Sequence, residues 1–273
     1  MTNRDIYVDI QGNGPALILL HSWCGSHHDW ARVIDLLKDH FTLYTWDARG
    51  HGRSVHHGEK PCTLFQMATD LNNLISDYKL NKPMVVGHSM GAFILWQYLE
   101  TYGQDNLSQI AIIDQTPKLV TDPTWVHGIY GKFNQEKSAA FINALQDDFA
   151  ENVLKLAAFG HNAKTHKKYE ENSKGIQTLR TYLQNLDPIP LIDIWRGLTQ
   201  ADFRDLLPNI TLPTLLVYGT DSNYYGKAVA HYMQNTLPHN QLHLIEQADH
   251  SPHLFDPERF VKIINQFKDF AYV

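Results

Sequence analysis

Short apolar stretches alternate with amphipathic stretches along the first 117 residues. Runs rich in aliphatic and β-branched residues predict strands over Ile6–Ile10, Ala16–His21, Phe41–Trp46, Met84–Gly87 and Gln109–Ile113. Between them, apolar positions recur at helical spacing and predict helices over Trp30–Leu37, Thr63–Tyr78 and Ala92–Tyr102. Nearly continuous apolar strands that alternate with helices are typical of a parallel sheet covered on both faces. The pattern therefore predicts an α/β fold.

The alternation stops between residues 118 and 208. This stretch contains helical patterns such as Lys137–Phe149 and Lys174–Leu186, and it has no strand pattern. The alternation then resumes with strands over Thr214–Gly219 and Gln241–Ile245 and helices over Lys227–Asn235 and Pro257–Phe270. We expect a core made of residues 1–117 and 209–273, with residues 118–208 as a helical cap. Such a cap would cover the sheet edge where open α/β sheets bind ligands.

Composition narrows the class of partner. The chain of 273 residues is 43% hydrophobic and 19% charged, which excludes a disordered protein and a coiled coil. Its net charge of −6 and its scattered Lys and Arg residues argue against binding to nucleic acid or to an anionic membrane. The longest aliphatic run, Ala16–Leu20, is too short to span a bilayer, and the first ten residues lack the apolar region of a signal peptide. We expect a cytoplasmic protein with a small-molecule substrate and no membrane insertion, and the pattern fixes no oligomeric state.

The sixteen histidines raise the question of a metal site. The close pairs are His27 with His28, His239 with His243, and His250 with His253, and none has the spacing of known zinc motifs. We therefore expect no metal and no other cofactor.

The strongest chemical motif is Gly87-His88-Ser89-Met90-Gly91, which matches GxSxG. A predicted strand precedes it and a predicted helix follows it, which is the context of a nucleophile elbow. Small residues two positions before and after the serine allow the tight turn that exposes its hydroxyl. We expect Ser89 to be a catalytic nucleophile.

A serine nucleophile needs a base and an acid that orients the base. His250 follows the last predicted strand, within Ala248-Asp249-His250-Ser251-Pro252-His253, and we expect it to be the base, with His253 structural or in the pocket wall. Two aspartates are candidates for the acid. Asp114 ends the strand that should lie beside the nucleophile strand, and Asp221 follows strand Thr214–Gly219. We favour Asp114 and keep Asp221 as the alternative, which would otherwise be a turn residue.

Two backbone N–H groups are needed to bind the oxyanion of an acyl-transfer intermediate. We expect them from Met90, directly after the nucleophile, and from Trp23, in the loop after strand Ala16–His21. For substrate binding we expect the side chains of Cys24, His88, Trp125, Tyr130 and Phe133. The cap aromatics among them favour an apolar acyl group as ligand.

These motifs resemble the α/β-hydrolase superfamily over essentially the whole chain. The run Asp47-Ala48-Arg49-Gly50-His51-Gly52-Arg53-Ser54 matches the DxRGHGxS loop of that superfamily. The resemblance implies a mostly parallel sheet flanked by helices, with a helical cap inserted after the sixth strand. Within the superfamily, the chain resembles the capped group that includes carboxylesterases, haloperoxidase-like perhydrolases and quorum-quenching acyl-homoserine lactone hydrolases. This resemblance therefore implies a serine hydrolase, an esterase or lactonase, that forms an acyl-enzyme.

A second resemblance points to different chemistry. Cofactor-free 3-hydroxy-4-oxoquinoline 2,4-dioxygenases also carry the acid at the position of Asp114 and a Trp-Cys pair like Trp23-Cys24. They use a His–Asp dyad to remove a substrate proton, but they have a histidine where this chain has Met90. A third alternative is a receptor of the same fold that binds a small ligand without turnover. Fold alone does not decide between these functions.

Overall fold

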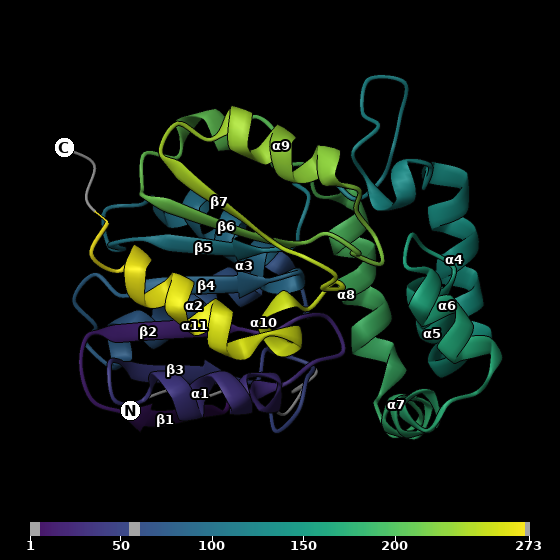
Figure 1. The fold of residues 1–273 in the computed structure, drawn as a ribbon, viewed down its shortest axis with the longest axis horizontal. Coiled ribbons are helices and arrows are strands. Elements are labelled where there is room, and N and C mark those ends of the chain that lie inside the picture. The colour runs from purple at the N-terminus through teal and green to yellow at the C-terminus, as the bar shows by residue number, and fades with distance from the viewer. Residues whose placement is uncertain (1–5, 55–60, 271–273) are drawn as a thin grey trace.

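The computed structural model describes residues 6–54 and 61–270, and a seven-stranded sheet lies at its centre (Figure 1). The strand order is β1-β3-β2-β4-β5-β6-β7; only β1 runs antiparallel to its neighbour, and the other pairs are parallel. The strands are β1 (Val8–Gly12), β2 (Ala16–Leu20), β3 (Thr42–Trp46), β4 (Met84–His88), β5 (Ile110–Ile113), β6 (Thr214–Gly219) and β7 (Asn240–Ile245). The expected mostly parallel sheet is confirmed.

Helices cover both faces of the sheet. On one face lie α1 (Ala31–Leu37) and α11 (Pro257–Phe267), and on the other lie α2 (Leu64–Asp77), α3 (Met90–Tyr102) and α9 (Lys227–Thr236). The short helix α10 (Pro252–Phe255) precedes α11. Burial on both faces explains why the central strands are apolar along their whole length, as in the buried sequences ALILL of β2 and IAII of β5.

Five further helices lie beside the carboxyl ends of the parallel strands (Figure 1). They are α4 (Gln135–Asp147), α5 (Phe149–Ala158), α6 (Ala163–Glu170), α7 (Lys174–Gln184) and α8 (Pro188–Gln200), and together we refer to them as the cap helices. The sequence predicted one helix over Lys137–Phe149, but this helix ends at Asp147 and a second one begins at Phe149. Asp148 has an extended backbone, and its carboxylate accepts a hydrogen bond from the Glu151 N–H, so it caps a new helix.

The position of these helices corrects one expectation. They follow β5, the fifth strand of the described sheet, and not a sixth strand. Within the described residues β1 is the only strand before β2, so five strands have formed when the cap helices begin.

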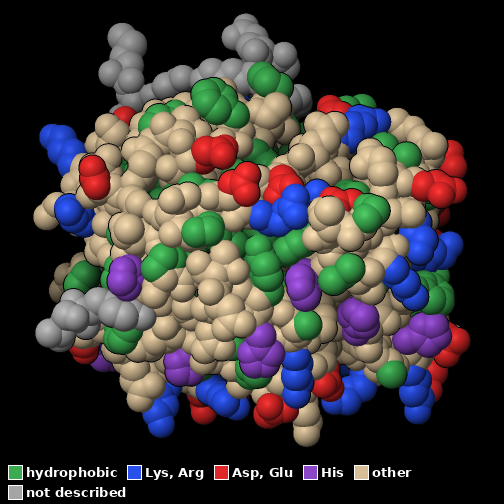
Figure 2. All heavy atoms as spheres, turned by 90° about the horizontal axis from the view of Figure 1, so that it is seen from above, with side chains coloured by type: hydrophobic (Ala, Val, Ile, Leu, Met, Phe, Trp, Pro, Cys, Tyr) green, Lys and Arg blue, Asp and Glu red, His purple; other side chains and the backbone are tan. Residues whose placement is uncertain are grey.

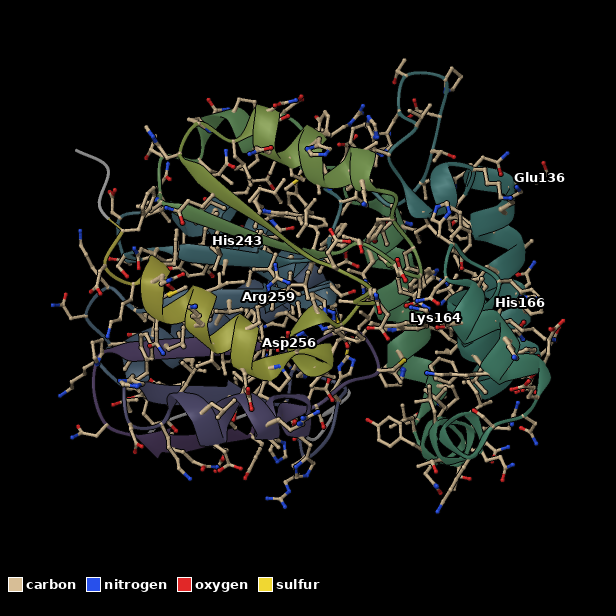
Figure 3. All side chains as sticks on the ribbon, viewed as in Figure 1. Glu136, Lys164, His166, His243, Asp256 and Arg259 are labelled. Carbon is tan, nitrogen blue, oxygen red and sulfur yellow. The ribbon has the colours of Figure 1, made fainter. Side chains whose placement is uncertain are left out.

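The cap helices are joined to core loops by side-chain hydrogen bonds. The Trp23 indole N–H donates to the Leu191 carbonyl at 2.9 Å, and the Tyr182 hydroxyl donates to the Cys24 carbonyl at 2.9 Å. A surface ion pair adds a third contact: Lys164 of α6, labelled in Figure 3, lies 3.1 Å from the Asp221 carboxylate. These contacts hold the cap helices over the loops at the carboxyl ends of the strands.

Two further features concern the surface and length of the elements. On the face shown in Figure 2, acidic and basic side chains are interspersed with histidines and form no patch of one sign. Among the residues that the structure describes, no helix is both long and apolar enough to cross a membrane.

Candidate active site

Ser89 stands on a sharp turn between β4 and α3. Its backbone has φ 53° and ψ −113°, a conformation that L-residues rarely adopt and that is found where surrounding structure enforces it. The two flanking glycines make the turn possible by close approach. A Cβ on Gly87 would come within 2.6 Å of the Gly91 carbonyl oxygen, and one on Gly91 within 2.4 Å of the Leu20 carbonyl oxygen. The GxSxG pattern thus has a steric cause in this fold.

The Asp114 and His250 side chains meet beside this turn. Asp114 directly follows β5, the neighbour of β4, and its Oδ2 atom lies 2.7 Å from Nδ1 of His250. The same oxygen accepts a hydrogen bond of 2.6 Å from the Ser222 hydroxyl. Because Nδ1 is engaged by the carboxylate, the other ring nitrogen, Nε2, is the one left for proton transfer.

Burial sets the protonation of this pair. Asp114 is fully buried, which raises the pKa of its carboxyl, and the Ser222 hydroxyl opposes that rise. Burial lowers the pKa of His250 to about 4, and the neighbouring Asp249 carboxylate partly offsets this. The imidazole is therefore neutral at pH 7 and able to accept a proton.

Asp221, the alternative acid, points elsewhere. Its side chain is partly exposed and forms the ion pair with Lys164, while its backbone carbonyl accepts from the Asn162 amide at 2.7 Å. The residue that does approach Asp114 from this loop is Ser222, one position further along the chain.

The loop that carries Trp23 and Cys24 is held by the DxRGHGxS segment. The Cys24 N–H donates to Nε2 of His51 at 3.2 Å, and Cys24 has φ 62°. Burial lowers the pKa of His51 to about 3, so its Nε2 can act as an acceptor. Trp23 and Met90 both line the pocket in front of Ser89, where their backbone N–H groups were expected.

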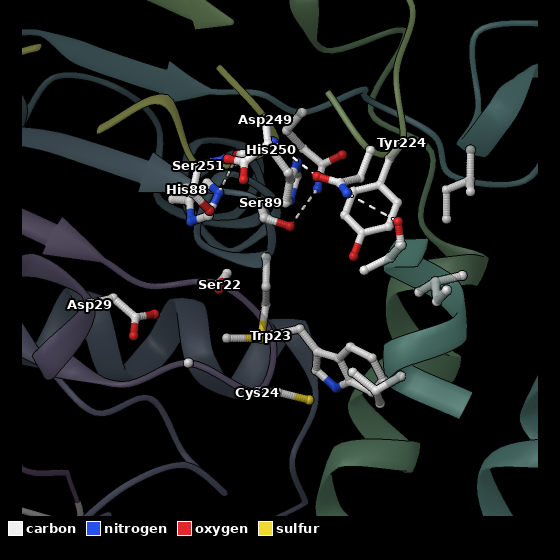
Figure 4. Close-up of a pocket in the computed structure, with 18 of the residues that line it drawn as sticks. Ser22, Trp23, Cys24, Asp29, His88, Ser89, Tyr224, Asp249, His250 and Ser251 are labelled. Atoms are coloured by element: carbon white, nitrogen blue, oxygen red, sulfur yellow. Dashed lines mark hydrogen bonds between the residues drawn. The ribbon is translucent and has the colours of Figure 1, made fainter. Parts of the chain in front are cut away.

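A cavity of about 370 Å³ lies between this edge of the core and the cap helices (Figure 4). This volume is near the lower end of the range for small-molecule sites, which is about 300–1,000 Å³. Ser89 and His250 lie on its core side, and its opposite wall is mostly apolar, with Thr165 and Tyr182 as polar members. Buried members of that wall are Leu119, Ile129, Leu156, Leu183, Trp195 and Leu198.

The charged groups of the pocket are acidic. The carboxylates of Asp29 and Asp249 line it on the core side (Figure 4), and among the residues that the structure describes no lysine or arginine does so. Burial raises the pKa of Asp29 to about 6, with hydrogen bonding from Ser26 opposing it. Above that pH the Asp29 carboxylate makes the pocket unfavourable for an anionic group.

The expected substrate-binding residues divide into two groups. Cys24 and His88 line the pocket, but His88 is 2% exposed and its Nε2 donates to the His250 carbonyl at 2.9 Å. The His88 side chain therefore holds the backbone of the segment that carries His250. His253 is fully buried and its ring packs on Trp30 and His88.

The prediction that Trp125, Tyr130 and Phe133 bind substrate is not supported by their positions. In the described residues none of them lines the pocket in front of Ser89. The Trp125 ring packs against Tyr232, the Tyr130 hydroxyl donates to the Leu156 carbonyl, and Phe133 packs in an aromatic group with Trp195. Trp125 packs against a helix of the core, since Tyr232 belongs to α9, and both Trp125 and Phe133 are buried, so their apolar area is removed from water away from the pocket.

Several pocket residues had no role in the sequence analysis. Asn223 accepts from the His250 N–H at 3.2 Å and donates to the Ala157 carbonyl at 3.0 Å, so it connects the base to a cap helix. The Tyr224 ring packs edge-on against His250, 4.5 Å between centroids. Gln115 contacts the Ser89 hydroxyl. Gln115 follows Asp114 in the sequence, but only the fold shows which of these side chains turn into the pocket.

Comparison with known proteins identifies relatives of the whole chain. A family model described as alpha/beta hydrolase fold matches residues 15–257. The chain is 26% identical over 262 residues to a pimeloyl-[acyl-carrier protein] methyl ester esterase from Vibrio vulnificus, with 94% of this chain and 96% of the relative covered. Among solved structures it resembles an esterase from Exiguobacterium antarcticum, with TM-score 0.82, 22% identity and 97% and 96% of the two chains covered.

A further solved structure has the same fold. Est816, described as an N-acyl homoserine lactone degrading enzyme, superposes with TM-score 0.75 at 21% identity, covering 96% of each chain. At these identities the solved structures show the shared fold. Because the family model matches most of the length of this chain, the chain belongs to the alpha/beta hydrolase fold family.

Proposed function

We propose that this protein is a carboxylic ester hydrolase that works through a Ser89–His250–Asp114 triad. The observation that carries the proposal is the 2.7 Å contact between Asp114 and His250 directly beside a serine held in a strained turn at a pocket floor. Nucleophile, base and orienting acid are the three groups that a serine triad uses for acyl transfer.

In the first half of the reaction Ser89 Oγ attacks the ester carbonyl carbon. His250 Nε2 takes the serine proton and then gives it to the departing alcohol oxygen. Asp114 holds the ring through Nδ1 and favours the imidazolium that forms. The Met90 and Trp23 N–H groups bind the oxyanion.

In the second half water attacks the acyl-enzyme carbonyl. His250 Nε2 now takes a proton from the water and returns it to Ser89 Oγ as the acyl–oxygen bond breaks. The products are a carboxylic acid and free Ser89, so the cycle needs no cofactor.

The pocket favours an uncharged ester or lactone with an apolar acyl chain. The apolar wall removes aliphatic carbon from water, at about 25 cal/mol per Å² buried. The acidic groups on the core side, with no lysine or arginine among the described lining residues, disfavour a carboxylate on the substrate. An N-acyl homoserine lactone meets both conditions, and the likeness to Est816 supports that class.

Mass spectrometry of the products tests the function. The substrates are a series of acyl-homoserine lactones of rising chain length together with simple methyl esters. Lactone opening adds one water with the amide bond intact, and ester cleavage releases alcohol and acid. We expect turnover that rises with chain length, and loss of roughly 10⁴-fold or more in Ser89→Ala and His250→Ala.

The same variants separate the competing chemistry. Hydrolysis that survives in Ser89→Ala would remove the covalent mechanism. Oxygen uptake with a 3-hydroxy-4-oxoquinoline that survives in Ser89→Ala but not in His250→Ala would instead establish the dioxygenase reading. A ligand bound without turnover of any ester would favour a receptor.

A further inference from the structure

Gln115 carries an amide that touches the proposed nucleophile. Its side chain is 2% exposed, lines the pocket, and donates from Nε2 to Ser89 Oγ over 3.5 Å. This distance is long for a hydrogen bond, and contacts of this kind commonly shorten when substrate is bound. Neither the triad nor the expected oxyanion donors give this amide a role.

The orientation of the amide follows from its other end. Gln115 Oε1 accepts hydrogen bonds from the Thr116 N–H at 2.8 Å and from the Tyr225 hydroxyl. Of the two ends of the side-chain amide, only the oxygen can accept from the Thr116 N–H, so the NH₂ end must face Ser89. Burial raises the pKa of the Tyr225 phenol, which keeps it a neutral donor.

The backbone of Gln115 is held as well. The Tyr218 hydroxyl donates to the Gln115 carbonyl oxygen, and the preceding residue, Asp114, sits in the left-handed region with φ 44°. The Gln115 residue is thus held at its amide oxygen and at its backbone before any substrate arrives. Such preorganisation is the condition for an efficient electrostatic contribution.

The direction of this hydrogen bond determines what it can do. Because Gln115 donates to Oγ, it occupies a lone pair and leaves the serine proton free for His250. Negative charge builds on Oγ when that proton leaves during acylation, and again when the acyl–oxygen bond breaks during deacylation. A fixed N–H at this atom lowers both barriers.

We propose that Gln115 is a catalytic residue whose amide N–H stabilises charge on Ser89 Oγ, and that Tyr225 is the positioning residue that aims it. This inference rests on the proposed function, since it needs Ser89 to be the nucleophile. The backbone oxyanion donors act on the substrate carbonyl oxygen, whereas Gln115 acts on the serine oxygen. The two contributions are therefore separable.

Pre-steady-state kinetics with a p-nitrophenyl ester test the inference, because the burst reports acylation and the steady state reports deacylation. Gln115→Leu is expected to slow both steps roughly 10- to 100-fold while KM changes by less than about threefold. Tyr225→Phe is expected to slow both steps about 3- to 10-fold. The double variant should be no slower than Gln115→Leu, because Tyr225 acts only through Gln115.

Tyr102→Phe is the matched control, since it also removes a tyrosine hydroxyl that donates a hydrogen bond, here to the Thr69 hydroxyl at 3.0 Å, but outside the pocket lining. It should leave both rate constants unchanged. Melting temperatures are compared for all variants, and if Gln115→Leu does not fold, Gln115→Asn replaces it, because a shorter amide cannot reach both partners.

The outcomes are distinct. Unchanged rate constants in Gln115→Leu, a change in KM alone, or losses that add in the double variant would overturn the inference. Absence of any burst in the wild-type enzyme, with turnover retained in Ser89→Ala, would instead overturn the proposed function.

Discussion

The two walls of the pocket come from different parts of the chain and are built differently. The core wall consists of loops at strand ends, where Ser89, Asp114 and His250 are fixed by a strained turn and by short hydrogen bonds. The cap wall consists of apolar side chains from helices that meet the core through a few hydrogen bonds, such as Trp23 to Leu191. The backbone conformation of the loops thus positions the reacting groups, and packing between distant segments forms the surface that we expect the substrate to contact.

This difference assigns separate effects to the two walls. Changes in the core wall should lower the rate of the chemical step for every ester. Changes in the cap wall should alter the preference between esters and leave the chemical step intact.

The largest expected effect separates the two candidate acids. Asp114→Asn removes the charge that holds His250 and should lower kcat by roughly 10⁴-fold. Asp221→Asn breaks only a partly exposed ion pair with Lys164, which contributes at most about 1 kcal/mol, so turnover should stay near wild type. Steady-state kinetics at matched melting temperature decide between them, and a greater loss in Asp221→Asn would reverse the assignment.

The pH profile gives the next effect. The pKa of His250 is lowered to about 4, and the neutral imidazole is the active form, so the part of the kcat/KM profile that reports His250 should fall as the pH drops through about 4. At pH 5 about 90% of His250 should be neutral, against about 3% for a histidine of ordinary pKa. Circular dichroism at each pH separates titration from unfolding. An acid limb centred near pH 6.5 would show that His250 is not desolvated as described.

The cap wall is tested by filling it. Ala157 lines the pocket, and its carbonyl, which accepts from Asn223, is unaffected by a change of side chain. Ala157→Phe should lower kcat/KM for an octanoyl ester about tenfold and for an acetyl ester by less than about threefold. Ala157→Ser is the size-matched control. Equal loss on both esters would mean that this wall does not contact the acyl chain.

The smallest effect concerns substrate charge. Asp29→Asn keeps an acceptor for the Ser26 N–H but removes the negative charge. It should raise activity several-fold toward an ester whose alcohol part carries a carboxylate, relative to its uncharged analogue. The pKa of Asp29 is raised to about 6, so the wild-type enzyme should show the same relief as the pH falls below that value. Asp47 and His27 face Asp29 and modulate this titration. No change in the ratio of the two esters would place Asp29 away from the alcohol part.

Much of the core could be predicted because its signals are local. Strand Thr214–Gly219 has the bounds that its apolar run predicted, and α3 begins two residues earlier than expected, at Met90. The contact of Asp114 with His250 was predictable once β5 was placed beside β4, since adjacent strand ends meet at one sheet edge. Its role in turnover stays a prediction.

The cap and the polar lining were harder to predict. Helix α8 has Pro188 and Pro190 in its first turn, where prolines are tolerated, and the Asp187 side chain caps it. Tyr225 reaches Gln115 across 110 positions of sequence, and no local pattern encodes such a contact. Aromatic content alone predicted Trp125 in the pocket, but its ring packs against Tyr232 of the core helix α9 instead.

Mass spectrometry of the enzyme during turnover tests the central proposal most directly. A slowly hydrolysed ester is mixed with wild-type protein, quenched in acid, digested and mapped. We predict one acyl group on the peptide that contains Ser89, formed and lost at the rate of turnover and absent in Ser89→Ala. Turnover without an adduct on that peptide, or an adduct on Cys24 in its place, would contradict it.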